Sequence, residues 1–566
     1  MRYHTFVTDY DGTIAENERV SKATIDALSR LKATGRKLIL VTGRELDQLQ
    51  TVFPEYGIFD IIVAENGALI YNSASKKVIL LGTRPPQTFI KLLQDKNIPV
   101  SVGQVIVATW EPYQEVVLEA IKSFGLEYQL IFNKGAIMIL PPGINKATGL
   151  HAALIELNLS EHNTVAVGDA ENDNALLEAA ECAVAVNNAL PLLKENADWV
   201  TNNSRGAGVV ELIDQLIADD LLLLDKKLSR HFLPLGEKAA GIPFTISPYG
   251  NNILLAGTSG CGKTTFTAAF VEQLILKQYQ FCLIDPEGDY QDLPGALTIG
   301  DGSQPPLTDH VIKVLTQTSE NAIVCFLAIP LGERPAHFKR LLTELVKLRD
   351  STGHPHFIII DEAHHLLPKD DREIVSALPE HLTNIMAITT KPALLSHAFL
   401  QRINLVIAMG ECPEQTMGSF SGITSSAIKF PDNLIYQRNF ALVWQKEQKL
   451  SFTITGNIPA KLLMRHKRKY ASGDMYANSF YFTGPNHKLH LKANNLMVFI
   501  QMATGVDDDT WLYHLHRHDY SNWFRNSIKD PQLSDYSKVI ENAGNDPGSS
   551  RRHIFKLIMN TYTSPA

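Results

Sequence analysis

Short apolar runs alternate with longer amphipathic stretches over most of the chain. Runs such as Lys37–Val41, Ile61–Ala64 and Thr164–Val167 are short and rich in β-branched side chains, which is typical of buried strands. Thr24–Ala33 and Ala147–Leu157, in contrast, have the apolar spacing of helices. Strands and helices in alternation predict an α/β fold, in which helices cover a mostly parallel sheet.

This pattern is interrupted by a connector and changes again near residue 458, so the chain divides into four segments. Around 219–238 it becomes charged and leucine-rich, which we interpret as a connector, and beyond about 458 it becomes polar and mainly helical. The predicted segments are an α/β domain at 1–217, a helical connector at 218–240, a second α/β domain at 241–458 and a helical C-terminal domain at 459–566.

Composition narrows the class of protein further. Of the chain's residues 45% are hydrophobic and 20% charged, and this composition excludes a disordered or fibrous protein. With 566 residues the chain is also too long for a single core, since a domain has about 150 residues. No apolar run reaches the roughly 18 residues of a membrane span, and the first residues lack a signal-peptide layout. Five scattered cysteines without a CxxC pair predict a protein of the reducing cytoplasm. We expect the protein to have no membrane partner. The net charge of −8 argues against a chain that binds nucleic acid over its whole surface, although a local basic channel stays possible.

The first candidate site begins where an apolar strand ends in two acids. Asp9 and Asp11 are two residues apart at this strand end, so both side chains can face one ligand. One carboxylate can attack phosphorus and form an aspartyl-phosphate, while the other protonates the leaving group and later activates water. Two acids at a strand end also offer oxygen ligands to Mg²⁺. Such a pair alone is weak evidence, because it also occurs in solvated turns.

Three later segments supply the other groups of such a site. Thr42 ends a strand with a hydroxyl that can bind a phosphate oxygen, and Lys146 opens a helix and supplies a cation. Asp169 and Asp173, with Asn172 before the second acid, follow another strand and can complete a Mg²⁺ shell. Four ordered pieces at element ends predict a catalytic site rather than a series of solvated turns.

In these segments the sequence resembles the haloacid dehalogenase superfamily, specifically its Cof-like (IIB) branch of sugar phosphatases and archaeal phosphoglycolate phosphatases. The resemblance covers about Met1–Leu216 and includes Ala64–Ala68. It implies a Rossmann-like core, a small C2-type cap at about Thr83–Pro142, and a Mg²⁺-dependent phosphatase acting on a small phosphorylated metabolite. Trp110 and Glu111 of the cap could line the substrate pocket, although an aromatic residue in a small domain is more often part of its core.

The resemblance also implies a role for each motif residue. Asp9 is the implied nucleophile, and Asp11 is the implied general acid and base. The implied Mg²⁺ ligands are Asp9, Asp11, Asp169 and Asp173. The residues implied to bind the phosphate or the rest of the substrate are Thr42, Gly43, Asn66, Lys146 and Asn172.

The second candidate site is a glycine-rich loop between a strand and a helix. The segment Gly257–Thr265 contains Gx₄GK[ST], and its strand–loop–helix setting is the one that this phosphate-binding motif requires. Its glycines let backbone N–H groups turn inward around phosphate, while Lys263 reaches the β- and γ-phosphates and Thr264 binds Mg²⁺. The residues predicted to bind ATP here are Gly257, Ser259, Gly260, Gly262, Lys263, Thr264 and Thr265.

An acidic strand end is the predicted partner of this loop. An apolar run ends in Asp361 and Glu362. Asp361 is predicted to hold the Mg²⁺ shell of ATP together with Thr264, and Glu362 to polarise the attacking water, which favours a hydrolase over a kinase. His364 and His365 follow directly, but no other ligand spacing supports a metal there, so a surface or packing role is the more common explanation.

The turn at Ile284–Tyr290, taken together with this acidic strand end, resembles the HerA–FtsK ATPases. The resemblance covers about Ile242–Ile458 and implies a RecA-like fold, ATP hydrolysis and a homo-oligomeric ring, usually a hexamer, with nucleotide at subunit interfaces. Two departures argue against DNA translocation: Thr390 stands where a Gln is expected, and the phosphatase-like segment replaces the N-terminal barrel of HerA translocases. Arg402 is a candidate arginine for a neighbouring subunit's nucleotide, although surface arginines are common.

The C-terminal segment carries weaker signals. The basic run Arg465–Lys469 could bind nucleic acid or an acidic partner, but such a run is more often a solvated linker. His514, His516 and His518 do not share one helical face, so an aromatic core with a polar rim is a better interpretation than a metal site. No chemistry is assigned to this segment.

Three functional hypotheses follow from the two sites. In the first, which we favour, the chain is a bifunctional hydrolase whose ATP state or ring assembly regulates the phosphatase. In the second, it is a nucleic-acid motor or defence protein whose phosphatase-like unit processes nucleotides or nucleic-acid ends, which the acidic net charge opposes. In the third, the ATPase unit binds ATP only as an assembly module, which the intact Glu362 opposes.

Overall fold

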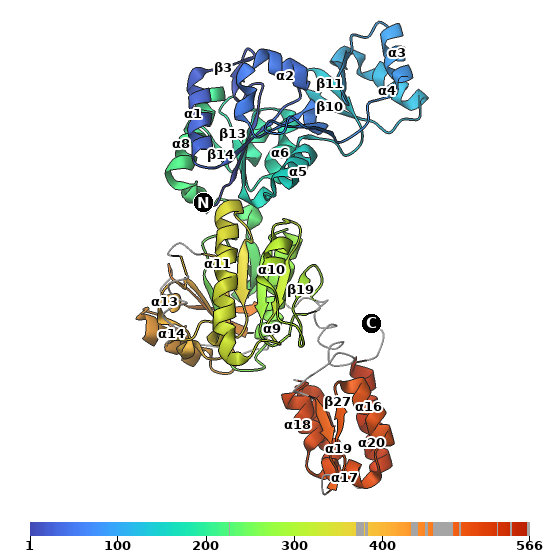
Figure 1. Ribbon diagram of the computed structural model, residues 1–566, viewed down its shortest axis with the longest axis vertical. Helices are drawn as coiled ribbons and strands as arrows, with labels where there is room; N and C mark the ends of the chain where they lie inside the picture. The colour runs from blue at the N-terminus through green and yellow to red at the C-terminus, as the bar shows by residue number, and fades with distance from the viewer. Residues whose placement is uncertain are drawn as a thin grey trace. The chain divides into compact units, whose positions relative to one another are not determined.

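The computed structural model describes most of the chain, and these residues form two compact units. The described residues are 1–225, 227–291, 293–369, 378–379, 383–431, 440–447, 451–456, 479–485, 488–528, 530–543 and 546–562 (Figure 1). The first unit comprises Met1–Gly257, Gln273–Tyr436 and Ala441–Ile454, and the second comprises Thr258–Glu272, Gln437–Phe440 and Thr455–Ala566.

An eight-stranded sheet with helices around it forms the N-terminal part of the first unit. The strand order is β14-β13-β12-β1-β4-β5-β6-β7, parallel from β14 to β5 and antiparallel at β6 and β7. The strands are β1 (Thr5–Asp9), β4 (Lys37–Val41), β5 (Ile61–Ala64), β6 (Leu69–Asn72), β7 (Val78–Leu80), β12 (Thr164–Gly168), β13 (Cys182–Ala185) and β14 (Trp199–Val200). The helices are α1 (Lys22–Ala33), α2 (Leu46–Val52), α5 (Lys146–Leu157), α6 (Asn174–Ala179), α7 (Pro191–Asn196) and α8 (Arg205–Asp219). The α/β prediction is therefore confirmed for this part.

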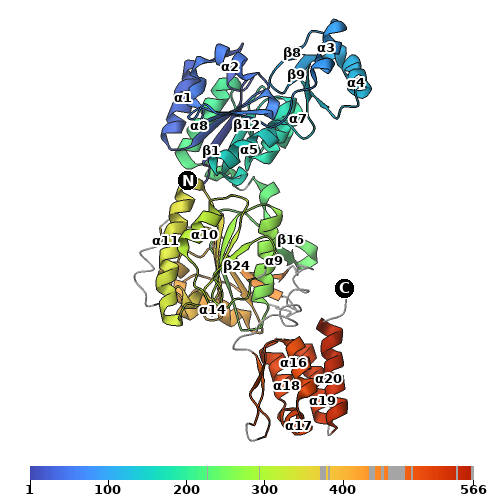
Figure 2. The same ribbon diagram turned by 45° about the vertical axis from the view of Figure 1, so that its right-hand side comes forward.

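A small α/β insertion follows β7 and ends before α5, within the interval predicted for a cap (Figure 2). It has a four-stranded antiparallel sheet of order β10-β11-β9-β8. Its elements are α3 (Gln87–Asp95), β8 (Ser101–Val102), β9 (Val107–Trp110), α4 (Gln114–Ser123), β10 (Gln129–Asn133) and β11 (Ala136–Leu140). Phe89, Leu93 and Val117 pack in a hydrophobic cluster of its own. Trp110 is outside that cluster and 57% exposed, so its expected core role is wrong.

The leucine-rich connector differs from the predicted helix. Helix α8 ends at Asp219, and the next two residues have left-handed backbone conformations, which stop a right-handed helix. Two 3₁₀ turns follow, and then strand β15 (Leu233–Lys238) joins the next sheet. Leu221, Leu224 and Leu228 are buried in the N-terminal hydrophobic core. These leucines therefore pack inward onto the sheet and its helices instead of lining one helix.

An eleven-stranded sheet forms the central part of the chain. Its order is β16-β15-β25-β24-β23-β17-β22-β21-β18-β20-β19, and the strands from β23 to β19 are parallel. The strands are β16 (Ile242–Ile246), β17 (Ile253–Gly257), β18 (Phe281–Asp285), β19 (Leu297–Ile299), β20 (Ala322–Cys325), β21 (Phe357–Ile360), β22 (Ile385–Thr389), β23 (Leu405–Met409), β24 (Phe440–Gln445) and β25 (Phe452–Gly456). Helices in this part are α9 (Lys263–Leu276), α10 (Thr308–Leu315), α11 (Arg334–Thr352), α13 (His397–Leu400) and α14 (Pro413–Thr424).

The eight-stranded and eleven-stranded sheets contact each other where their strands begin. His162 lies just before β12 and stacks on Tyr279, just before β18, with ring centroids 3.7 Å apart. Tyr249 donates from its hydroxyl to the backbone oxygen of His162 at 2.6 Å, and His356 Nε2 lies 3.0 Å from Asn163 Oδ1. The predicted catalytic residues follow the opposite, carboxyl ends of strands in both sheets. Asp9 and Asp361 therefore lie on the far sides of this junction.

A buried carboxylate, Glu181, is at the centre of the junction. Arg2 Nη2 donates to Glu181 Oε1 at 2.9 Å, the Tyr279 hydroxyl donates to Oε2 at 2.9 Å, and His162 Nδ1 lies 2.7 Å from Oε2. Burial alone would raise the pKa of Glu181, but the hydrogen bond with His162 and the charges of His162, His231 and Arg2 lower it to about 2. His162, Glu181 and His231 have ligand atoms within 4.8 Å of one another. However, Arg2 already supplies positive charge, and both ring nitrogens of His162 face oxygen atoms.

The C-terminal part contains a short hairpin and a group of helices. The elements are β26 (Phe480–Phe482), β27 (Leu491–Ala493), α16 (Leu496–Gly505), α17 (Asp508–His516), α18 (Asp519–Asn526), α19 (Pro531–Ala543) and α20 (Pro547–Tyr562). Trp511 stacks on Tyr520 at 4.4 Å within a buried aromatic cluster, as expected. His514 Nε2 accepts from the backbone N–H of Thr483, which confirms a packing role. The basic run at 465–469 lies outside the described residues.

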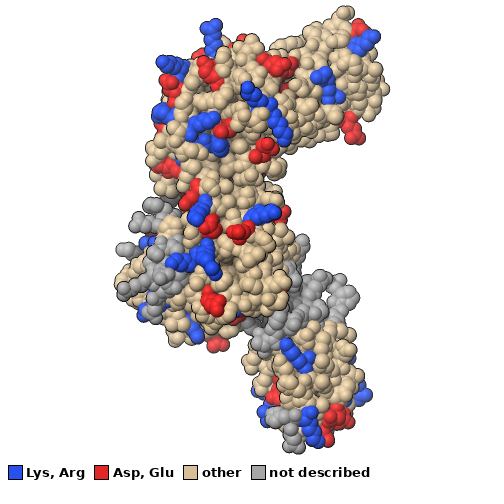
Figure 3. Space-filling model, in the orientation of Figure 1, with Lys and Arg blue, Asp and Glu red and all other residues tan. Residues whose placement is uncertain are grey.

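Two surface observations concern the membrane and nucleic-acid predictions. Among the described helices, none combines the length and the apolar character that crossing a bilayer requires. On the face drawn in Figure 3, the described Lys and Arg side chains are interspersed with Asp and Glu. On this face, the described charges therefore do not form the continuous basic stripe that is typical of a nucleic-acid channel.

Candidate active sites

The carboxyl ends of neighbouring parallel strands bring the first group of motif residues together. Asp9 ends β1 opposite Val41 of β4, so Thr42 follows at the same edge of the sheet. Residues Thr8 and Val167 are paired between β1 and β12, which places Asp169 beside Asp9. The strand order therefore explains why motifs far apart in sequence meet.

Three buried acids form the centre of this site. Asp9, Asp169 and Asp173 have carboxylate oxygens within 4.8 Å of one another. Burial, with the nearby charge of Asp173, raises the pKa of Asp9 to about 7, and burial also raises that of Asp169. Asp173 Oδ2 accepts from the backbone N–H groups of Asp169 and Ala170 at 2.9 Å each, which fixes its position. An all-oxygen group of buried acids fits Mg²⁺, which would relieve their mutual repulsion.

Lys146 neutralises this acidic group from the first turn of α5. Asn145 caps the helix, with its side chain accepting from the backbone N–H of Thr148 at 3.0 Å. The Lys146 ammonium donates to Asp9 Oδ1 at 2.6 Å and to Asp173 Oδ1 at 2.5 Å, and its side chain is 1% exposed. Burial by itself would lower the pKa of Lys146, but the charges of Asp173 and Asp9 raise it. The predicted cation is therefore in direct contact with the predicted nucleophile.

The other predicted substrate residues also converge on this edge. Asn66 donates from its backbone N–H to the backbone oxygen of Thr42 at 2.9 Å, and its side-chain oxygen accepts from Asn172 at 2.9 Å. A Cβ on Gly43 would lie 2.8 Å from the methyl carbon of Met138 in the cap. Within the described residues, Asn66 Nδ2 and Asn172 Oδ1 are buried without a hydrogen-bond partner. Unsatisfied buried amide groups are typical of a ligand-binding site.

Asp11 differs from the other acids in its surroundings. Its carboxylate is not part of the buried acidic group and is bound by Arg44, with Nε donating to Oδ2 at 2.6 Å and Nη2 to Oδ1 at 2.7 Å. Lys134 of the cap donates to the backbone oxygen of Asp11 at 3.0 Å and to Asp169 Oδ2 at 2.9 Å. The roles of Asp11 as general acid and as Mg²⁺ ligand stay predictions.

Three residues of this region were missed by sequence reasoning. Arg44 directly follows the predicted Thr42 and Gly43, so its position was a usable signal. Lys134 lies in a turn of the cap and carries no sequence signal of its own. Glu65 is buried and accepts from three successive backbone N–H groups of the cap at 2.7–2.9 Å. Glu65 thus fixes the cap against the core.

Acidic residues also meet at the carboxyl edge of the eleven-stranded sheet. Ile284 of β18 pairs with Ile360 of β21, so Asp285 and Asp361 end neighbouring strands. Burial, and then the charge of Asp285, raise the pKa of Asp361 well above its usual value. Asp285 accepts from the backbone N–H groups of the turn that follows it at 2.7–3.0 Å, which organises this turn. Paired buried acids fit a divalent cation, as predicted for Asp361.

Glu362 is held in an unusual conformation beside this pair. Its backbone is left-handed with φ 39°, and its N–H donates to Asp361 Oδ1 at 2.9 Å. His364 Nδ1 lies 3.2 Å from Glu362 Oε2 and 3.1 Å from the hydroxyl of Thr389, the last residue of β22. His364 is 9% exposed, which agrees with the packing role expected for it. Thr390 directly follows this strand end.

The glycine-rich loop belongs to the second compact unit. It follows β17 and ends where α9 begins at Lys263, which is the predicted strand–loop–helix setting. Gly260 and Gly262 have φ of 78° and 100°, a region that favours glycine. Lys263 Nζ donates to the backbone oxygen of Thr258 at 2.9 Å. The ATP-binding roles of this loop's residues stay predictions.

Arg402 has partners within its own chain. Its guanidinium donates from Nη1 to the backbone oxygen of Pro379 at 2.5 Å and from both Nη1 and Nη2 to that of Leu378 at 3.2 Å. An arginine that serves a neighbouring subunit would have to leave these carbonyl oxygens. The structure therefore favours a structural role for Arg402.

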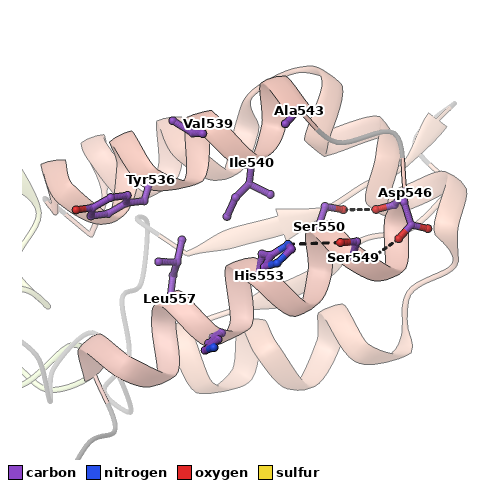
Figure 4. A pocket seen from close by; sticks show the side chains of 10 residues that line it. Tyr536, Val539, Ile540, Ala543, Asp546, Ser549, Ser550, His553 and Leu557 are labelled. Carbon is purple, nitrogen blue, oxygen red and sulfur yellow. Dashed lines mark hydrogen bonds between the residues drawn. The ribbon is translucent and has the colours of Figure 1, made fainter.

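A groove of about 580 Å³ lies between α19 and α20 (Figure 4). Its lining residues are Tyr536, Val539, Ile540, Ala543, Asp546, Ser549, Ser550, His553, Lys556 and Leu557. Ser549 Oγ lies 3.5 Å from His553 Nδ1, but Asp546 accepts from the backbone N–H of Ser549 and does not orient the imidazole. The groove therefore lacks the ordered nucleophile, base and acid of a hydrolase triad.

Comparison with known proteins identifies the class of the two main parts. Residues 6–110 and 127–213 match the family model of haloacid dehalogenase-like hydrolases, and residues 248–400 match that of an AAA domain. These matches confirm the haloacid dehalogenase superfamily for the first part and the P-loop class for the second part. They support phosphatase activity in the N-terminal part and ATPase activity in the central part.

Two archaeal relatives align with the N-terminal part. "Phosphoglycolate phosphatase 2" of Saccharolobus solfataricus is 32% identical over 221 residues, which cover 37% of this chain and 91% of the relative. "Phosphoglycolate phosphatase" of Methanothermobacter thermautotrophicus is 31% identical over 219 residues, covering 36% and 95%. The chain belongs to the haloacid dehalogenase-like hydrolases.

Proposed function

We propose that the chain is a bifunctional hydrolase that combines a Mg²⁺-dependent phosphomonoesterase with a HerA-like ATPase. The phosphatase assignment is supported by the buried group of Asp9, Asp169 and Asp173. The Lys146 ammonium lies between Asp9 and Asp173. A carboxylate held beside a lysine and a hard-oxygen cation site is suited to attack phosphorus.

In the proposed reaction, Asp9 attacks phosphorus and forms an aspartyl-phosphate, while the bond to the leaving oxygen breaks. Asp11 protonates that oxygen and then removes a proton from the water that hydrolyses the intermediate. Lys146, Thr42, Gly43, Asn66 and Asn172 hold the phosphoryl group and the rest of the substrate. Asp9, Asp11, Asp169 and Asp173 would hold Mg²⁺, which when bound would neutralise charge on the phosphoryl oxygens.

The proposed substrate is a small phosphorylated metabolite of the phosphoglycolate or sugar phosphate class. The two aligned archaeal relatives, both named as phosphoglycolate phosphatases, support the first member of this class.

For the central part, we propose that Lys263 and Thr264 bind the phosphates and Mg²⁺ of ATP, that Asp361 supports Mg²⁺, and that Glu362 activates water. The parallel order β17-β22-β21-β18, with acids at two strand ends, supports this assignment. In this proposal, six copies of the chain assemble into a ring, and this assembly regulates the phosphatase. We place the protein in the cytoplasm.

A phosphatase screen over a panel of phosphorylated metabolites, with Mg²⁺ and with or without ATP, tests this proposal. We expect phosphate release from small phosphorylated acids or sugars and a rate that depends on ATP. Removal of Mg²⁺ with a chelator should stop the release. An absence of turnover across the panel and with an aryl phosphate would contradict the phosphatase assignment, whereas equal rates with and without ATP would contradict only the regulation.

A further inference from the structure

Two basic side chains that the proposed reaction leaves without a role meet at Asp11. Arg44, from the loop after β4, binds both carboxylate oxygens of Asp11 at 2.6 and 2.7 Å. Lys134, from the turn between β10 and β11, donates to the backbone oxygen of Asp11 at 3.0 Å. One cation comes from the core and the other from the cap, so side chains of both parts meet at Asp11.

The contact with Arg44 conflicts with the action of Asp11 as an acid. A general acid must carry a proton and face the leaving oxygen. Both carboxylate oxygens of Asp11 are occupied by the Arg44 guanidinium, so neither is turned toward a leaving group. The Asp11 side chain is 41% exposed, so it has room to turn once it is released. Asp11 can therefore act only after Arg44 has found another anionic partner.

Lys134 is placed where it can share such a partner. A Cβ on Gly12 would lie 2.8 Å from Lys134 Nζ, so the missing side chain at Gly12 lets the cap lysine approach the core. Its side chain is 49% exposed and can move toward a ligand without opening a packed core. Glu65 binds the cap backbone at 104–106, which keeps the cap, and hence Lys134, near this edge.

We infer that Arg44 and Lys134 bind a carboxylate of the substrate, and that this binding takes Arg44 from Asp11 and frees Asp11 to act as the acid. The inference rests on the proposed phosphatase function and narrows its substrate to phosphorylated carboxylic acids. A guanidinium presents paired donors that match a carboxylate, and an ammonium adds a second positive charge. Once released from Arg44, the Asp11 side chain can turn toward the leaving oxygen, which is where its proposed role as the acid requires it.

The geometry of the substrate supports this exchange. In phosphoglycolate, the carbon that carries the ester oxygen also carries the carboxylate. An ester oxygen placed next to Asp11 therefore brings the carboxylate close to Arg44 as well. A neutral sugar phosphate has hydroxyl groups at this position, which compete poorly with Asp11 for a guanidinium. With such a substrate, Asp11 would stay bound to Arg44, and protonation of the leaving oxygen would be slow.

The test is a comparison of two substrates of matched size on the full-length protein with Mg²⁺. Phosphoglycolate carries the carboxylate, and 2-hydroxyethyl phosphate carries a hydroxymethyl group in its place. The quantity measured is the ratio of their kcat/KM values. We expect the wild type to favour phosphoglycolate by about tenfold or more, and Arg44→Gln and Lys134→Met each to lower this ratio by about tenfold, the usual effect of losing a hydrogen bond to a charged group. Arg44→Lys, which keeps the charge but loses the paired donors, should give an intermediate ratio.

Matched controls separate the possible outcomes. Lys96→Met replaces an exposed lysine elsewhere in the cap and should leave the ratio unchanged. Because Lys134 is half-exposed, Lys134→Met keeps the test usable where Arg44→Gln fails to fold. Equal efficiency of the wild type on the two substrates, or a proportional loss on both in the variants, would overturn the inference. Hydrolysis of an aryl phosphate but of neither test substrate would overturn it too, whereas no hydrolysis of any of the three would refute the proposed function itself.

Discussion

Among the residues of the phosphatase site, Lys146 has two tasks that depend on the same contacts. Its ammonium lies between Asp9 and Asp173, which would otherwise be neighbouring buried carboxylates. It therefore keeps the acidic group together, because the repulsion between unpaired buried charges is costly. It also favours the ionised form of Asp9 against the effect of burial, and only the ionised form can attack phosphorus.

Replacement of Asp9 by Asn tests the proposed nucleophile. The amide has nearly the same size but cannot attack phosphorus, so phosphate release from an aryl phosphate should fall by about a thousandfold or more. ATP hydrolysis by the same preparation should change little, because the two sites lie at the carboxyl ends of strands in two separate sheets. Asp47→Asn, at an exposed position of α2, is the control. Full phosphatase activity of Asp9→Asn would show that the aspartyl mechanism is wrong.

Glu362→Gln tests the proposed water-activating group of the ATPase. The variant keeps Asp361 and should bind ATP with nearly normal affinity, but hydrolyse it about a hundredfold more slowly. Binding of a fluorescent ATP analogue and release of phosphate measure the two effects separately. Lys263→Ala should instead weaken binding itself. If Glu362→Gln lost binding to the same degree as Lys263→Ala, its assigned role could not be kept.

The roles of residues at the ends of strands and helices could be predicted from the sequence. The roles of residues that depend on the contact between cap and core could not. Asp9 and Asp169 follow apolar strands and Lys146 opens a helix, so their chemistry is visible as a local pattern. Lys134 reaches the site only because the cap folds back on the core. The role of Glu65 also depends on tertiary structure, because the backbone groups that it binds lie about forty residues further along the chain. A charge in a turn has the same sequence signature whether it faces solvent or an active site.

At the level of elements, the strands were easier to predict than the connection between the domains. Short β-branched runs such as Ile61–Ala64 became fully buried strands, because such side chains fit a sheet covered on both faces. The leucines at 221–224 have no comparable signature, since the same spacing suits a helix or a pair of tight turns. In the structure they form a tight turn, in which Leu221 and Leu224 are buried in the N-terminal core while Leu222 and Leu223 are exposed.

The junction between the sheets predicts a specific acid sensitivity. The pKa of Glu181 is lowered from 4.5 to about 2, so its contribution to stability is present above pH 4.5 and lost as the pH falls toward 2. Burial lowers the pKa of His231 from 6.5 to about 4, so stability is also lost as the pH falls through this range. Urea unfolding between pH 7 and 3 should show both effects.

Glu181→Gln gives the control for this measurement. The variant should be less stable than the wild type at pH 7, by about 3 kcal/mol from the lowered pKa, and the difference should shrink below pH 4.5. A constant difference between the two proteins over the whole range would show that the Glu181 charge does not stabilise the junction.

At the scale of the whole molecule, the proposed ring makes a prediction about mass. A subunit contact that joins two different surfaces and closes on itself gives cyclic symmetry, and six subunits are expected from the HerA resemblance. Light scattering with Mg²⁺ and a non-hydrolysable ATP analogue should therefore give a mass several times 62.8 kDa. A clean monomer at micromolar concentration would exclude both the ring and regulation through it.

The contact between the starts of the two sheets has a further consequence for heat resistance. His162 stacked on Tyr279, with Glu181 bound from both sides, makes it costly for one sheet to melt while the other stays folded. A ligand that binds only the folded protein raises the melting temperature of everything that unfolds with its site. A phosphate analogue bound at Asp9 should therefore delay heat inactivation of ATP hydrolysis. On heating, the two activities would then be lost together, and an occupied phosphatase site would protect both.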